Sequence, residues 1–313
     1  MNRAGHPARI DASVVVPFII FTAIWGSTWI VIRDQLGVVP PQWSVAYRFG
    51  IAAIAMALVA KWKGHDLRLD RGGLFAALVL GVTQFSVNFN SVYLAERYIT
   101  SGIVATVFAL LLIPNSLLAW AFLGHKPDRR FLLAGLVAVA GVGLLFVNEL
   151  RTSPTEGRHV ATGIALTLLG LLGASSANVY QAGKEALRHP LLALLAWSMA
   201  IGAVLDALIA FAVAGPPVFD PRPSYWFGLL YLALAASVLC FSLYFPVVRK
   251  IGPGKAAYSS VLVPIIAMSL STMFEDYRWT GLAAAGGILA IGGMLLALAG
   301  RRQPMLVTAP DAA

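Results

Sequence analysis

Apolar residues in this chain form long runs that are separated by short polar segments. Ten of these runs have the length, about 20 residues, that a helix needs to cross the hydrocarbon core of a bilayer. They cover residues 14–32, 41–60, 72–95, 100–123, 131–147, 160–183, 191–214, 225–248, 254–274 and 279–299. The pattern predicts an all-α integral membrane protein with ten transmembrane helices.

The composition points to the same environment. Hydrophobic residues make up 59% of the 313 residues and charged residues 12%, whereas soluble domains carry roughly 25% charged residues. The net charge of +9 is spread over short clusters between the apolar runs, unlike the single basic face of a nucleic-acid-binding protein. We therefore expect the lipid bilayer, and no nucleic acid, as a partner. The lone Cys240 lies in an apolar run, which indicates a packing role.

Lysine and arginine are unevenly divided between the two sides that a ten-helix topology creates. With the N-terminus in the cytoplasm, the cytoplasmic segments hold 16 of these residues and the opposite segments hold 6. Because cytoplasmic loops are enriched in positive residues, both termini are predicted to be cytoplasmic. Residues 1–13 and 300–313 then form tails. The first run is expected to be a retained helix, since no small-residue cleavage site follows it.

The two halves of the chain share residues in the same order. Five residues of the first half recur 152 positions later, and one proline recurs 150 positions later. The recurring pairs are Phe75 and Phe227, Phe89 and Phe241, Arg97 and Arg249, Ile99 and Ile251, Gly102 and Gly254, and Pro114 and Pro264. The sequence therefore predicts two five-helix units, 14–149 and 160–299. A unit with an odd number of spans lies upside down relative to its copy, which predicts an inverted repeat around a site near the membrane midplane.

Two sets of residues mark how these helices meet. Small residues follow one face of the fifth run, including Gly141, and of the tenth run, including Gly286 and Gly293, which predicts close packing of those two helices. Pro114 and Pro264 lie within the fourth and ninth runs, where a proline removes a backbone hydrogen bond and kinks the helix. They mark either helix breaks at a central site or kinks that serve packing alone.

Uncharged polar and aromatic residues gather in the first, third, fourth, sixth, eighth and ninth runs. Such side chains are costly against lipid, so they are expected to face inward, either as hydrogen bonds between helices or as contacts to a solute. The aromatic candidates to cover an apolar part of a solute are Trp25, Tyr93, Tyr180, Tyr244 and Tyr258. The polar candidates to bind it are Ser27, Asn88, Ser91, Asn115, Asn178 and Ser260. Thr28, Trp29, Gln84 and Gln181 belong to the same group.

Arg48 and Asp206 are the ionisable residues that fall well inside the predicted spans. Arg48 is a candidate to reach the interface, to pair with a helix end or to contact a substrate carboxylate. Asp206 is a candidate proton carrier, although it lies in the seventh run, outside the polar group. A central site without a carboxylate favours a neutral or zwitterionic solute with an apolar part over an organic cation.

Enzyme motifs are missing from the chain. The five histidines lie in tails or loops without metal-ligand spacing, and neither a nucleophile elbow nor a phosphate-binding glycine loop is present. No catalytic residue, metal or cofactor is therefore expected.

The segment Trp25-Gly26-Ser27-Thr28-Trp29, followed by Pro41 and Arg48, resembles the opening of the EamA-type half of the drug/metabolite transporter superfamily. Further positions that fit this pattern are Pro114, Gly135 and Gly141 in the first half and Pro264, Glu275, Gly286 and Gly292 in the second. The chain departs from the pattern in two places. Ser175-Ser176-Ala177-Asn178 stands where the second Trp-Gly-Ser would be, and His125 stands where the family often has glutamate.

The resemblance covers nearly the whole chain and implies a cavity lined mainly by helices 1, 3, 4, 6, 8 and 9. Within the superfamily the chain is most similar to the YddG-type amino-acid exporters. This implies a bacterial inner-membrane protein that exports aromatic, neutral or other small amino acids by alternating access. A monomer is one possibility, and the oligomeric state stays open. A multidrug or other metabolite exporter is the alternative, and a membrane scaffold that moves no solute is a rival of another class. Substrate, direction, proton coupling and resting conformation stay open.

Overall fold

The computed structural model describes residues 12–124, 126–152, 157–251 and 259–299, and within these ranges all regular structure is helical. The elements in chain order are α1 (Ala12–Asp34), α2 (Pro41–Trp62), α3 (Arg71–Leu80), η1 (Gly81–Asn88), α4 (Phe89–Ala95), α5 (Ser101–Ala109), α6 (Leu112–Leu123), α7 (Arg129–Thr152), α8 (Gly157–Gln181), α9 (Lys184–Leu187), α10 (Leu191–Ala214), α11 (Pro223–Leu230), η2 (Tyr231–Leu239), α12 (Cys240–Ile251), α14 (Ser259–Phe274) and α15 (Gly281–Ala299).

The lengths of these helices fit a protein that crosses a membrane many times. Within the described ranges, eight helical segments are long and apolar enough to span a bilayer. They are Ser13–Asp34, Pro41–Trp62, Arg71–Ala95, Ser101–Leu123, Arg129–Thr152, Arg158–Gln181, Leu191–Ala214 and Pro223–Tyr244. Two shorter apolar helices, Val261–Phe274 and Gly281–Ala297, occupy the places expected for the ninth and tenth spans. The all-helical membrane fold is confirmed, and the number of ten spans stays a prediction.

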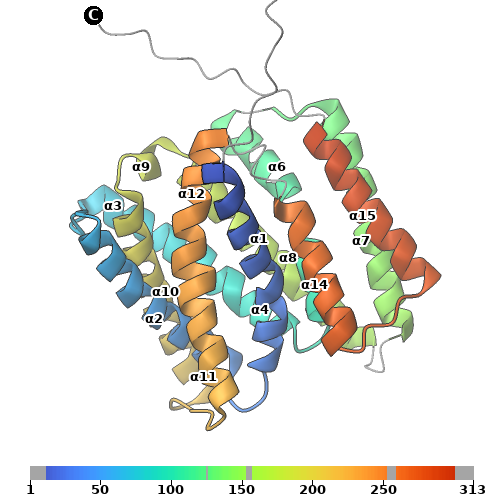
Figure 1. Cartoon of the computed structure of the whole chain (residues 1–313), viewed down its shortest axis with the longest axis horizontal. Helices are drawn as coiled ribbons and strands as arrows, with labels where there is room; N and C mark the ends of the chain where they lie inside the picture. Colours follow the sequence, from blue (N-terminus) through green and yellow to red (C-terminus); the bar gives the residue numbers. More distant parts are fainter. Residues whose placement is uncertain (1–11, 125, 153–156, 252–258, 300–313) are drawn as a thin grey trace, which may run out of the picture.

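The helices run side by side in one bundle (Figure 1). The pairs α2 with α10 and α7 with α15 pack along much of their lengths, and α1 packs against α14. Figure 1 shows the α7–α15 pair at one side of the bundle and α2, α3 and α10 at the other, with α1, α12 and α14 between them. We call the two ends of the bundle the α9 end and the α11 end, after the short helices that lie there in Figure 1.

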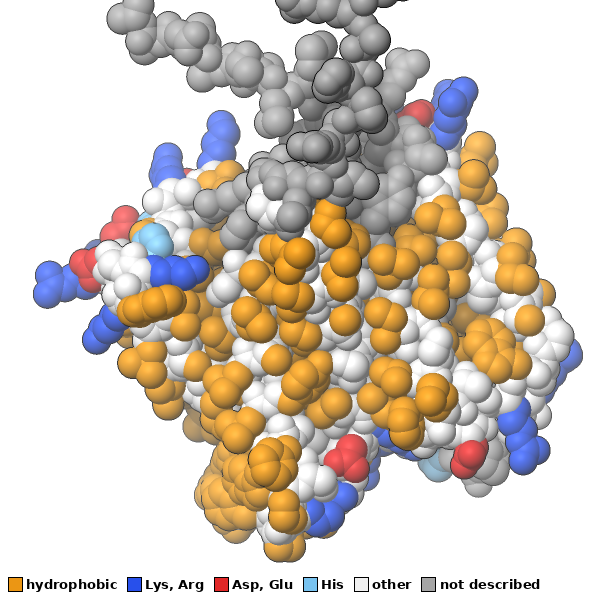
Figure 2. Space-filling model, in the orientation of Figure 1, with side chains coloured by type: hydrophobic (Ala, Val, Ile, Leu, Met, Phe, Trp, Pro, Cys, Tyr) orange, Lys and Arg blue, Asp and Glu red, His pale blue; other side chains and the backbone are white. Residues whose placement is uncertain are grey.

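The outer surface of the bundle is apolar across its middle. Figure 2 shows hydrophobic side chains over the broad centre of the viewed face, and lysine and arginine side chains towards its upper and lower margins. Large side chains such as Leu58, Phe211 and Val213 are 62–71% exposed. An apolar belt bounded by charges is the surface that lipid tails solvate and water does not.

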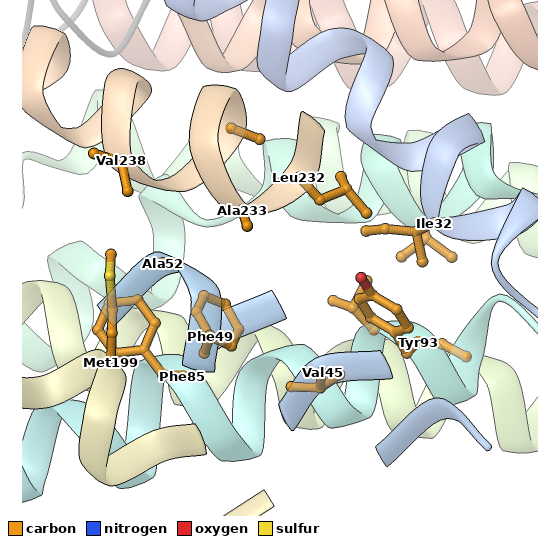
Figure 3. Close-up of a cluster of buried hydrophobic side chains, with 14 of the residues drawn as sticks. Ile32, Val45, Phe49, Ala52, Phe85, Tyr93, Met199, Leu232, Ala233 and Val238 are labelled. Atoms are coloured by element: carbon orange, nitrogen blue, oxygen red, sulfur yellow. The ribbon is translucent and has the colours of Figure 1, made fainter. Parts of the chain in front are cut away.

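A buried apolar cluster joins α2 to both π-helical segments. Figure 3 shows Phe49 of α2 and Phe85 of η1 on one side, and Ala233 and Val238 of η2 facing them. The Phe49 and Phe85 rings meet edge to face with their centroids 5.0 Å apart, a preferred aromatic geometry. This cluster holds η1 and η2 against the same helix.

Two spans contain π-helix at corresponding places. The segment η1 begins at residue 81 in the third span, and η2 begins at residue 231 in the eighth. A π turn holds more residues than an α turn and turns the following side chains around the helix axis, and such segments are frequent at functional sites. Both segments contribute to the cavity described below.

The two matched prolines lie in different backbone settings. In the fourth span the helix is interrupted at Leu110 and Leu111, and Pro114 lies in the first turn of α6. A residue there has no hydrogen-bond acceptor within its helix, so proline costs little. In contrast, Pro264 lies inside α14, which continues through it.

Glycine allows α7 and α15 to touch through their backbones. A Cβ atom added at Gly141 would lie 2.3 Å from the Ala290 nitrogen, and one at Gly293 would lie 2.4 Å from the Ala138 nitrogen. One at Gly286 would lie 2.8 Å from the Gly141 oxygen. The predicted packing of the fifth helix on the tenth by small residues is thus confirmed.

We expect Gly141→Leu to destabilise the protein strongly, because its side chain would collide with the backbone of α15. Overpacking costs about 1–3 kcal/mol and more where backbone cannot move. The matched control is Gly143→Leu on the same helix, where an added Cβ meets nothing within 4 Å. Thermal unfolding of the purified protein in detergent measures both variants. Equal unfolding temperatures for Gly141→Leu and the wild type would contradict the backbone contact.

Candidate functional site

A cavity of about 270 Å³ lies between the two halves of the chain. Helices α1, α5 and α6 and the segment η1 border it from the first half, and α8, η2, α12 and α14 border it from the second. Its size is close to the lower end of small-molecule sites, roughly 300–1,000 Å³. A cavity that draws its walls from both halves is the arrangement expected for a solute site between repeats.

The cavity extends towards the α9 end and stops short of the α11 end. Its lining reaches Gln181, the last residue of α8, and Ser259, the first residue of α14, at the α9 end. Towards the α11 end its last lining residues are Ile32 and Val92. Figure 3 shows Tyr93 next to Ile32 at this position.

Hydrogen bonds between helices close the bundle beyond that point. The Tyr93 hydroxyl donates to Gln35 Oε1 at 3.0 Å, and Gln35 Nε2 donates to the Tyr225 carbonyl at 3.4 Å. The Tyr225 and Ser44 hydroxyls are 2.8 Å apart. All four side chains are buried, so this network forms a polar floor beneath the cavity.

Aromatic rings cover two walls of the cavity. On one wall, Trp25 lies 5.7 Å from Phe241 and 5.1 Å from Tyr244, measured between ring centroids. The Trp25 indole donates to the Ala236 carbonyl at 3.0 Å, which fixes the ring against η2. On the other wall, Trp29 lies 5.3 Å from Phe108. Such rings can bury an apolar side chain of a bound molecule.

Five carboxamides supply most of the polar lining: Gln84, Asn88, Asn115, Asn178 and Gln181. The Oδ1 atoms of Asn88 and Asn115 are buried and have no hydrogen-bond partner within the described chain. Buried polar atoms of native proteins are nearly always satisfied by protein, water or ligand. These two oxygens are therefore unused acceptors of residues that line the cavity.

Arg48 of α2 supplies the charge of the cavity wall. The residue is only 2% exposed, and its Nε and Nη2 atoms each lie 3.4 Å from Ser237 Oγ. Its guanidinium lies over the Phe89 ring at 4.4 Å and the Phe49 ring at 5.1 Å. No described carboxylate pairs with it, and Nη1 has no hydrogen-bond partner. A buried cation of this kind calls for an anionic partner.

The segment η2 positions the serine that meets Arg48. Ser237 Oγ donates to the Leu232 carbonyl at 2.9 Å, five residues earlier, across a π turn. This bond leaves the Ser237 oxygen lone pairs facing the guanidinium. The first and second halves of the chain thus meet at Arg48.

The structure gathers part of the predicted site around the cavity. The predicted residues that line it are Trp25, Thr28, Trp29, Arg48, Gln84, Asn88, Asn115, Asn178, Gln181, Tyr244 and Pro264. Pro114 precedes a lining residue but does not line the cavity itself. Tyr258 lies outside the described residues, and so does the side chain of Ser260. Their roles in binding stay predictions.

Four other predicted residues make contacts away from the cavity. Ser27 Oγ lies 2.6 Å from the Tyr231 hydroxyl, which joins α1 to η2. Ser91 packs against α8 at Gly170. Tyr180 borders the apolar cluster of α3, α8 and α10, and Tyr93 belongs to the floor described above.

Asp206 also lies apart from the cavity lining. It is fully buried in α10, and its Oδ1 atom accepts a hydrogen bond from Asn90 Nδ2 at 2.8 Å. Asn90 donates in addition to the Ser86 carbonyl at 3.0 Å. The carboxylate therefore ties the seventh span to the third.

Sequence reasoning missed the four phenylalanines of the lining: Phe85, Phe89, Phe108 and Phe241. A phenylalanine in an apolar run has no feature that separates a cavity wall from a lipid contact. One signal was present, because Phe89 and Phe241 are a recurring pair of the two halves. Both residues of this pair line the cavity.

Comparisons with known proteins agree with this architecture. The model of the EamA-like transporter family matches residues 13–147 and 161–299. "Protein PagO" of Salmonella typhimurium is 23% identical over 295 residues, which are 94% of this chain and 95% of that protein. "Uncharacterized inner membrane transporter YedA" of Escherichia coli is 29% identical over 254 residues, 80% of this chain and 78% of that protein.

Two further similarities concern a named pump and a solved structure. "Probable amino-acid metabolite efflux pump" of Salmonella typhimurium is 24% identical over 305 residues, 91% of this chain and 94% of that protein. One crystal structure matches with a TM-score of 0.65 at 19% identity, over 91% of this chain and 96% of its own chain, and shows the fold alone.

These matches belong to membrane transporters rather than enzymes, as the sequence predicted. Together with the apolar helices they describe a multi-pass protein of the bacterial inner membrane. The chain belongs to the EamA-like transporter family.

Proposed function

We propose that this protein exports amino acids with an apolar side chain by alternating access between two inverted repeats. The observation that carries the proposal is the unpaired, buried guanidinium of Arg48 at the wall of a cavity with aromatic and amide sides. A relative with 24% identity is named as a probable amino-acid metabolite efflux pump, which supports the same substrate class.

Each part of a zwitterionic amino acid has a complementary group in the cavity. The carboxylate suits Arg48, whose free Nη1 atom can donate to it in a charge-assisted bond. The ammonium suits the unpartnered oxygens of Asn88 and Asn115. The apolar side chain suits the rings of Trp25 and Phe241, which already pack on each other. An organic cation would meet the like charge of Arg48 and find no carboxylate in the described lining.

The positive residues support a cytoplasmic α9 end. Lys63, Arg71 and Lys184 lie at that end, within the set of 16 lysines and arginines against 6 on the other side. In this orientation the cavity faces the cytoplasm and the polar floor closes the periplasmic side. Ten spans, with both termini in the cytoplasm, complete the proposed topology.

Transport by the purified protein in liposomes tests the substrate class. We expect saturable flux of labelled phenylalanine or leucine, and we expect Arg48→Gln to raise KM at least tenfold, because a charge-assisted contact contributes about 1.5–3 kcal/mol. The control is Arg188→Gln, which removes an exposed arginine paired only with Glu185. Flux of an organic cation without flux of any amino acid would instead support a multidrug exporter.

Single-cysteine labelling in intact cells tests the orientation. In a Cys240→Ala background, we expect an impermeant maleimide to label Pro217→Cys at the α11 end from outside. His65→Cys at the α9 end should react only after the membrane is permeabilised, because that end faces the cytoplasm. The opposite labelling pattern would invert the proposed topology.

We expect Asp206→Asn to leave the pH dependence of transport unchanged, and transport itself within about threefold. An asparagine oxygen can still accept the hydrogen bond from Asn90 that the carboxylate accepts now. Exchange and pH-driven flux in liposomes measure the two properties separately. Loss of pH-driven flux with preserved exchange would make Asp206 the proton carrier.

A further inference from the structure

A second group of ionisable side chains lies at the α11 end, beyond the floor of the cavity. Glu275, directly after α14, pairs with Arg33 of α1 at 3.6 Å between Oε1 and Nε. The Ser101 hydroxyl at the start of α5 donates to Glu275 Oε2 at 2.6 Å. These contacts join the ends of three helices, α1, α5 and α14, and close the α11 end of the bundle. We call them the closure.

Glu96 lies beneath this closure without a partner of its own. It follows α4 directly and is completely buried. Both of its carboxylate oxygens lack a hydrogen-bond partner among the described residues, and no described cation forms an ion pair with it. An ionised carboxylate in this state would bear a desolvation cost of several kcal/mol with nothing to offset it.

Charges of both signs act on Glu96, and none of them forms an ion pair with it. Glu275 repels it, and Arg33, which attracts it, is already paired with Glu275. Arg48 attracts it from α2 but lies at the cavity wall. Burial raises the pKa of Glu96 well above its ordinary value, and the charge of Glu275 raises it further.

The remaining neighbours supply no compensating charge. Tyr93, one turn earlier on α4, hydrogen-bonds Gln35 instead. From α8, Gly163 packs against Tyr98 and Ile99, and the His159 ring lies 5.7 Å from the Tyr98 ring rather than at Glu96. Another acidic residue, Glu149 of α7, is 6% exposed and adds negative charge beside Glu275.

We propose that Glu96 is a proton-binding site that links closure of the α11 end to pH. The proposal rests on the alternating-access mechanism above, in which the α11 end must open once in each cycle. Opening separates the Arg33 and Glu275 side chains and brings water to Glu96, which then releases its proton. Closing returns the carboxyl group to a dry site that accepts only the neutral form.

The direction of the pH effect follows from the different environments of Glu96 in the open and closed states. A carboxyl group with a higher pKa in the closed state than in the open state binds more protons when closed. Low pH therefore favours closure, and the ratio of open to closed molecules rises by up to about tenfold per pH unit between the two pKa values. The limit is about tenfold per pH unit because each molecule binds or releases one proton at Glu96.

Spin-label distances across the closure test the proposal without any substrate. In a Cys240→Ala background, labels at Val38→Cys and Phe274→Cys, two exposed positions beside α1 and α14, report the separation of these ends in lipid nanodiscs. Between pH 5 and pH 9 we expect the long-distance population to increase with pH. Glu96→Gln should hold the short distance throughout, because a neutral amide mimics the protonated carboxyl group.

The controls separate this proposal from folding defects and from the proposed function. Glu96→Leu, a neutral variant without polar atoms, should also remove the pH dependence, so the test survives if the glutamine variant misfolds. Asp206 is a second buried carboxylate, and Asp206→Asn should keep the wild-type dependence of the spin-label distances on pH. A wild-type profile in the Glu96 variants, or no pH dependence in the wild type, would overturn the proton site. Absence of amino-acid flux with an intact distance profile would overturn only the substrate assignment.

Discussion

The hydrocarbon interior of a bilayer offers no hydrogen-bond partners to a peptide backbone, and this constraint organises the whole protein. Every regular segment that the structure describes is helical, since a helix satisfies its backbone internally. Departures from α-helix are tolerated only where protein or a cavity provides other partners. The segments η1 and η2 and the interruption at Leu110 and Leu111 all lie on spans that border the central cavity. The irregular backbone and the candidate site are therefore two aspects of one arrangement.

Within that frame, the two halves contribute different groups to one site. The first half supplies Arg48 and most of the amides, and the second half supplies Ser237 and the Phe241 and Tyr244 rings. The guanidinium is held by aromatic rings and one hydroxyl rather than by a carboxylate. Because the wall keeps this charge unneutralised, the energetic cost of its burial is available to favour an anionic ligand group.

The fold could be predicted from the sequence because lipid imposes a simple pattern on it. Apolar run lengths, the repeat of Phe89 as Phe241 and the short family motifs led to a helical transporter of the EamA-like family, which the comparisons confirm. The π-helical segments could not be predicted, since their residues have no composition that separates them from α-helix. Ring orientation in space, rather than residue type, places Phe85 and Phe108 on the cavity wall.

The site was harder to predict because polar residues in a membrane have two uses. Asn88 and Ser91 lie one helical turn apart in the same span, yet one lines the cavity and the other packs on α8. Sequence periodicity gives their relative angle but not which neighbouring helix each one faces. Glu96 gave no signal either, because a carboxyl group at the end of an apolar run usually meets water at the interface.

The glycine contact between α7 and α15 has a consequence for how the protein moves. Side chains in an ordinary helix interface can change rotamer and let two helices slide, but here carbonyls and amide nitrogens meet with no side chain between them. The α7–α15 pair is therefore expected to keep one relative position at the edge of the bundle. In the proposed alternating-access cycle, changes of shape would fall on the other helices rather than on this contact.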